Sequence, residues 1–134
     1  MIFPPTPELY LHGAFERGIP NQERIVLRTQ SHLNLACYGL LLTSIQANGL
    51  ATPFQDQFFW FGETVLDPYT WVFVYTGMGV PRMTKTLEKN EAAYVIHWNR
   101  SGVIFTQSSI QPTLIRIDAA VTQSSDGSLF LPAS

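Results

Sequence analysis

Aromatic and β-branched side chains crowd residues 58–76, and this stretch constrains the fold more than any other. It contains FFWFG at 58–62 and, after the turn sequence Asp67-Pro68, YTWVFVYT at 69–76. Such residues favour pleated, half-buried strands, and Pro68 presets the backbone for a corner. In the second segment three rings alternate with Val72 and Val74, so both faces are apolar. We therefore expect a central strand that is covered on both faces, or covered on one face and facing a protein partner.

Further strands are expected at residues 23–28, 94–98, 103–106 and 112–118, which are bounded by turn-forming residues. The turn sequence at 99–102 predicts that 94–98 and 103–106 form a hairpin. Short strands at this spacing predict a mainly β fold, a single compact antiparallel β-sandwich or barrel.

Two interpretations remain open for residues 32–47. Apolar residues from Leu33 to Ile45 recur at helical spacing, and Asn48-Gly49 suits a C-terminal helix cap. Gly39 and the run LLLT at 40–43 suit a buried strand equally well. Periodicity alone does not decide between one helix and a strand here.

Composition divides the chain into three parts. Residues 1–8 carry three prolines and predict an extended arm, because proline lacks a backbone donor. Residues 9–121 are expected to form a single β-rich domain, since 134 residues leave no room for a second core. Residues 122–134 combine a polar, flexible linker with an apolar C-terminal tail.

Few charges cover this chain. Charged residues make up 13% of it and the net charge is −2, whereas roughly a quarter of a typical domain is charged. A surface with few charges indicates another protein or self-association as partner, in a hetero-complex or an oligomer. Eight basic residues scattered along the chain argue against nucleic acid.

The cellular setting follows from what the sequence does not contain. It has no signal-peptide pattern and no apolar run of membrane-spanning length, so we expect a cytoplasmic protein that does not bind membranes. Cys37 is the single cysteine, in an apolar segment where we expect it to pack as an inert small side chain.

No pattern of catalytic or metal-binding residues is present. The histidines at 12, 32 and 97 have no metal-ligand spacing, and neither a serine elbow nor a phosphate-binding loop occurs. The sequence therefore predicts no catalytic residue, no metal and no cofactor. One alternative is a small β-barrel enzyme or ligand-binding protein with a pocket around His97 and Arg100, which lie near aromatic residues.

The aromatic surplus supplies the candidate binding residues. Large rings are enriched at the energetic centres of protein interfaces. We expect Trp60, Tyr69 and Trp71 to contact a partner, with exposure near the strand ends for Trp60 and Tyr69. Phe130 and Leu131 in the apolar tail are further candidates.

Three segments together, FFWFG at 58–62, WVFVYTG at 71–77 and YVIHW at 94–98, carry a family resemblance. The chain, over roughly residues 15–120, resembles small uncharacterised bacterial proteins of antiviral gene cassettes, including cassettes with ubiquitin-like conjugation components. The resemblance implies an accessory binding subunit and brings no catalytic residues. A non-enzymatic protein-binding subunit of a bacterial multicomponent system is thus expected; a phage or other assembly protein is a second alternative.

Overall fold

The computed structural model describes residues 4–123 and 129–130 of the chain. The protein is mainly β, as the sequence predicts, and the longest helical segment within these residues is one three-residue turn. No helix in this part of the chain is long and apolar enough to cross a membrane. In chain order the elements are β1 (Leu9–Phe15), β2 (Arg24–Thr29), β3 (Leu33–Asn34), η1 (Leu35–Cys37), β4 (Tyr38–Ile45), β5 (Ala51–Trp60), β6 (Val65–Leu66), β7 (Trp71–Tyr75), β8 (Arg82–Lys85), β9 (Ala92–His97), β10 (Ile110–Arg116), β11 (Thr122–Gln123) and β12 (Leu129–Phe130).

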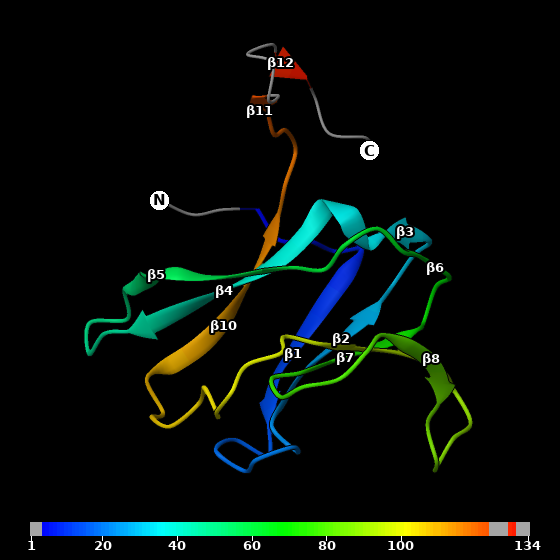
Figure 1. The fold of residues 1–134 in the computed structure, drawn as a ribbon, viewed down its shortest axis with the longest axis horizontal. Helices are drawn as coiled ribbons and strands as arrows, with labels where there is room; N and C mark the ends of the chain where they lie inside the picture. Colours follow the sequence, from blue (N-terminus) through cyan, green and yellow to red (C-terminus); the bar gives the residue numbers. More distant parts are fainter. Residues whose placement is uncertain (1–3, 124–128, 131–134) are drawn as a thin grey trace.

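Two sheets form the body of the molecule (Figure 1). One has five strands in the order β1-β2-β7-β9-β8, and the other has three in the order β10-β4-β5. Two short ladders, β3-β6 and β11-β12, complete the pairing in the described residues. Neither main sheet closes into a barrel, so the barrel alternative is wrong, and the two sheets pack around a shared core.

One pair departs from the expected antiparallel arrangement, because β7 and β9 run parallel from Trp71↔Ala93 to Tyr75↔His97. After β7 the chain passes to the sheet edge, forms β8, and returns as β9 between β7 and β8. Since β9 is antiparallel to its hairpin partner β8, it lies parallel to β7. The local sequence of a strand does not encode this order.

Residues 32–47 contain no long helix. They form β3, η1 and the eight-residue strand β4, which lies between β10 and β5. Because β4 pairs with a strand on each edge, this segment is a strand and not the helix that its periodicity also allowed. Gly39 is required in β4 because a Cβ there would lie 2.7 Å from a ring carbon of Phe58 and 2.8 Å from the Phe59 carbonyl oxygen.

The predicted hairpin of 94–98 with 103–106 is also wrong. The strand β9 forms, but it pairs with β7 and β8 instead. Residues 103–106 form a loop in which Ile104 and Phe105 are buried. A buried carboxylate, Glu23, satisfies the backbone amides of that loop in place of a strand ladder.

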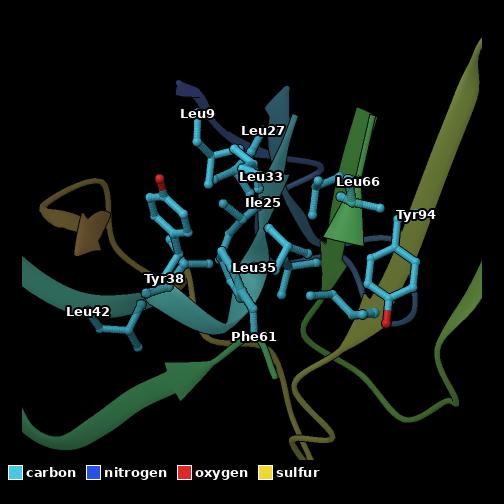
Figure 2. Packing of buried hydrophobic residues seen from close by; sticks show 14 of the residues in the cluster. Leu9, Ile25, Leu27, Leu33, Leu35, Tyr38, Leu42, Phe61, Leu66 and Tyr94 are labelled. Carbon is cyan, nitrogen blue, oxygen red and sulfur yellow. The ribbon is translucent and has the colours of Figure 1, made fainter. Parts of the chain in front are cut away.

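The core lies between the two sheets (Figure 2). From the five-stranded sheet come Ile25 and Leu27 of β2, together with alternate residues of β7 and β9. From the other side come Leu40 and Leu42 of β4, with Phe61 just after β5. Because these residues form one cluster, each sheet buries one face and leaves its other face outward.

Candidate functional site

Each main sheet presents one outer face, and the two faces differ in chemistry. We call the outer face of the five-stranded sheet the aromatic–arginine face. Its side chains, taken from alternate positions of the paired strands, are Tyr10, His12, Phe15, Arg24, Val26, Arg28, Trp71, Phe73, Tyr75, Arg82, Thr84, Ala93, Val95 and His97. We call the outer face of the three-stranded sheet the apolar face. Its residues are Gly39, Leu41, Thr43, Ile45, Ala51, Pro53, Phe58, Trp60, Gln111, Thr113 and Ile115.

Ring side chains contact one another across the aromatic–arginine face. Tyr10 meets His12 edge-on at 4.7 Å between centroids, and His12 lies 5.2 Å from Trp71. Along β7, Trp71 and Phe73 have planes 6° apart and centroids 6.2 Å apart. Tyr75 stacks on His97 at 5.6 Å. The strand register places these rings side by side, because alternate residues of a strand point to one face.

Two arginines of β2 lie over these rings. The Arg28 guanidinium is 4.6 Å from the Trp71 ring centroid and 5.9 Å from that of Tyr69. It also donates to Glu91 at 2.5 Å, so part of its charge is compensated. The Arg24 guanidinium lies 5.9 Å from the Tyr75 ring. Arginine over aromatic rings combines apolar contact area with directed hydrogen-bond donors.

Three buried side-chain atoms without a hydrogen-bond partner stand out among the described residues, and all three belong to this face. They are Nε of Arg28 and both ring nitrogens of His97. Burial, and then the nearby Arg82 charge, lower the pKa of His97 below its usual range. Buried polar groups are nearly always bonded, so these three atoms are exceptions within the described part of the chain.

The turn at residues 77–80 covers the His97 ring. A Cβ added at Gly79 would lie 2.6 Å from Cδ2 of the imidazole, so the 77–80 turn packs directly on the ring. His12 at the other end of the face also has a lowered pKa, first from burial and then from Arg28. The lowered pKa of each imidazole favours its neutral form, and arginines supply positive charge on this face.

The apolar face exposes large side chains of the edge strand β5. Phe58 is 43% exposed and Trp60 is 55% exposed, and Ile45 of β4 is also exposed. Across the sheet, Trp60 aligns with Gly39 and Ile115, and Phe58 aligns with Leu41 and Thr113. The outward side chains that the structure describes on this face are uncharged.

The structure separates the partner-binding residues predicted from the sequence. Trp60 lies on the apolar face, whereas Trp71 lies on the aromatic–arginine face with Tyr69 at its border. The exposure expected for Trp60 and Tyr69 is confirmed, at 55% and 62%. Phe130 belongs to β12, but its side chain and all of Leu131 lie outside the described residues.

His97 and Arg100 do not share a site. His97 points to the aromatic–arginine face, where it stacks on Tyr75. Arg100 instead donates to Gln57 of β5 and lies over Trp98, a side chain packed against the core. The alternation along the strand separates them, because Trp98 and His97 are neighbours in sequence and point to opposite sides.

An open pocket of about 430 Å³ lies at another place, between the start of β1 and the end of β10. In its wall Tyr38 donates to Glu8 at 2.5 Å, and Arg116 donates to the same carboxylate at 3.2 Å. Burial acts to raise the pKa of Glu8, but these hydrogen bonds outweigh it and lower that pKa; burial and then Glu8 raise the pKa of Tyr38. Cys37 lines this pocket and is exposed. The expectation that Cys37 packs inside the protein is therefore wrong.

Glu23 is the residue that sequence reasoning missed. Although 1% exposed, its carboxylate accepts from the backbone amides of Gly18, Ile104 and Phe105 and from the Thr76 hydroxyl, at 2.7–2.9 Å. Burial acts to raise its pKa, but these four hydrogen bonds outweigh burial and lower the pKa below its usual range. Its place at the start of an alternating strand gave no signal of this role.

Comparisons with known proteins add no relative. No protein-family model matches the chain, and no curated protein or solved structure matches it significantly. Within the described residues, no group of three or more His, Cys, Asp or Glu side chains is placed to hold a metal ion.

Proposed function

We propose that this protein is a non-enzymatic, protein-binding accessory subunit, and that the aromatic–arginine face is its partner-binding site. One observation carries the proposal: a continuous set of half-exposed rings and arginines on the outer face of the five-stranded sheet. Trp, Tyr and Arg are the residue types most enriched among interface hot spots. The family resemblance favours a bacterial multicomponent system, such as antiviral defence, as the setting.

The composition of this face matches an interface that forms between separate proteins. Such interfaces mix aromatic and polar groups, and they form hydrogen bonds around a buried centre. Here Trp71 is the centre, since it contacts His12, Phe73 and Arg28. Tyr10 and Tyr69 lie exposed at the border.

Affinity capture with the full chain tests this proposal. The wild-type protein and a Trp71→Ala variant are used as bait in a lysate of the source cells, with bound proteins identified by mass spectrometry. Truncating a hot-spot ring costs at least about 2 kcal/mol, which weakens binding roughly thirtyfold. Isothermal calorimetry with the purified partner checks that figure.

Trp60→Ala is the matched control, because Trp60 is an exposed tryptophan on the opposite face. The Trp60→Ala variant should bind the captured partner with the affinity of the wild-type protein. If no captured protein depends on Trp71, or if both variants lose the same partner equally, the assignment of this face is wrong.

A further inference from the structure

We propose that β8, an edge strand of the five-stranded sheet, binds an extended acidic segment of a partner protein, which pairs with β8 as an additional strand. The site is the edge of the sheet, not its outer face. It is available whether or not the aromatic–arginine face binds the partner proposed above. Three features of β8 support it: an exposed edge, backbone groups that point away from the sheet, and positive charge without a counter-charge.

The strand β8 lies at one end of the sheet (Figure 1). It pairs with β9, and no other strand in the described part of the chain pairs with it. All four of its residues are exposed, and Met83 is 56% exposed. An open edge of this kind is a template for a further strand, and strand addition is a common way for proteins to bind extended segments.

The direction of the backbone groups follows from the pairing of β8 with β9. Thr86, the residue after β8, donates its N–H to the Glu91 carbonyl at 2.8 Å. Successive residues of an antiparallel ladder point their N–H and C=O groups alternately toward and away from the partner strand. The N–H and C=O groups of Met83 and Lys85 therefore point away from β9. An added strand forms its hydrogen bonds with these groups.

Side-chain charge selects the kind of segment that this edge accepts. Arg82 and Lys85 are exposed, and neither forms an ion pair with another described residue. They stand an odd number of positions apart, so they point to opposite sides of the sheet. A segment with acidic residues three positions apart places one carboxylate opposite each of them.

The rest of the sheet has the same sign of charge. Every residue of its five strands is described, and those strands contain no Asp or Glu. Their charged residues are Arg24, Arg28, Arg82 and Lys85. The whole chain has a net charge of −2, so the positive charge is local to this sheet. Such a patch steers an acidic partner toward the edge.

The same charges disfavour a second copy of this chain at the edge. Pairing two β8 strands would bring two copies of Arg82 and two of Lys85 into one narrow ribbon. Like charges on neighbouring strands are destabilising, and charged edge strands resist edge-to-edge association. An acidic segment gains attraction where a second copy meets repulsion, so the edge discriminates between them.

Calorimetric titration of the full chain with synthetic peptides tests the proposal. The probe is an acidic peptide of valine and threonine with two glutamates three positions apart, and the control is a basic peptide with lysine in place of each glutamate. We expect the acidic peptide to bind and the basic peptide not to bind. A third peptide keeps both glutamates but is N-methylated at the amides that would face β8. It should bind at least about tenfold more weakly, because it cannot donate hydrogen bonds to the edge.

Reversing one charge on the edge should reverse the preference. Lys85→Glu should weaken binding of the acidic peptide roughly tenfold and should allow the basic peptide to bind. Lys89→Glu is the matched control, because it changes the net charge equally but lies in the exposed turn after β8. It should weaken binding of the acidic peptide far less. Thermal unfolding verifies that both variants are folded.

Amide hydrogen exchange followed by NMR locates the bound peptide. The amides of Met83 and Lys85 should exchange fast in the free protein and become protected by the acidic peptide. The Thr84 amide points toward β9, so its exchange should change little. Protection of other strands without protection of Met83 and Lys85 would place the peptide elsewhere and contradict the proposed edge site.

Three further results would overturn the proposal: no binding of the acidic peptide, equal binding of all three peptides, or protection of the β8 edge that appears without peptide as the protein concentration rises. The last result would identify a second copy as the occupant. All these experiments use peptides or the protein alone. Capture that depends on Trp71 is measured separately, so failure at the edge and failure at the aromatic–arginine face are distinguishable.

Discussion

At the scale of single residues, Glu23 shows how one buried carboxylate organises a loop. Its four hydrogen bonds connect the turn at Gly18, the end of β7 at Thr76 and the buried loop at 104–105. A buried charge is tolerated only with such complete bonding, since desolvation is otherwise costly. Gly18, Ile104 and Phe105 depend on the carboxylate to satisfy their backbone N–H groups, and Thr76 depends on it to satisfy its hydroxyl.

Replacing Glu23 with Gln should lower the free energy of unfolding by about 2–4 kcal/mol at neutral pH. The amide NH₂ cannot accept hydrogen bonds, so it leaves buried N–H groups unsatisfied. Urea denaturation followed by circular dichroism measures the change. Glu88→Gln, at an exposed turn position, is the control and should have no effect.

The loss caused by Glu23→Gln should also depend on pH. Because the pKa of Glu23 is lower in the folded than in the unfolded protein, its stabilisation is complete above the unfolded pKa, roughly 4.3. It disappears as the pH falls through the folded pKa. The stability difference between wild type and variant should therefore shrink in acid, and a difference that grows there would contradict this account.

At the scale of elements, the contact between β4 and β5 depends on the absence of a side chain at Gly39. Phe58 and the backbone of β5 occupy the space where a Cβ would lie. Local strand pairing thus depends on one small residue.

Gly39→Ala should destabilise the protein by about 1–3 kcal/mol, as overpacking of a close contact does. The exposed Phe58 ring can move, but the Phe59 carbonyl belongs to the neighbouring strand and must shift with it. Thermal unfolding measures the effect. Gly102→Ala is the control, because a Cβ there meets nothing within 4 Å; equal melting temperatures for both variants would refute the argument.

At the scale of the whole molecule, the two main sheets share one core and so should unfold together. Leu40 of β4 and Val74 of β7 are both fully buried in the same cluster, although they belong to different sheets. A single domain of this size with one core normally unfolds in an all-or-none transition. Neither sheet has a core of its own to keep it folded.

Leu40→Ala should therefore cost about 2–5 kcal/mol and shift the unfolding of both sheets by the same amount. Far-UV circular dichroism and tryptophan fluorescence, with Trp60 in one sheet and Trp71 in the other, should give coincident transitions. Leu50→Ala, at a 65% exposed position, serves as the control. Separate transitions would show that the sheets are independent units.

The sequence by itself determined the local character of the strands. Alternation in residues 71–75 predicted a strand with Val72 and Val74 on one side and three rings on the other, and β7 has this arrangement. Exposure of Trp60 and Tyr69 followed from their places near strand ends. These properties depend on side chains that are neighbours along the chain, where period-two geometry applies.

The tertiary structure alone decided which strands pair, and therefore which residues share a surface. It placed β9 parallel to β7, made residues 103–106 a loop on Glu23, and put Trp60 and Trp71 on opposite faces. Strand order depends on long-range contacts and on the closing of loops, whose free energies no local pattern contains. One aromatic cluster in the sequence thus became two separate surfaces in the folded protein.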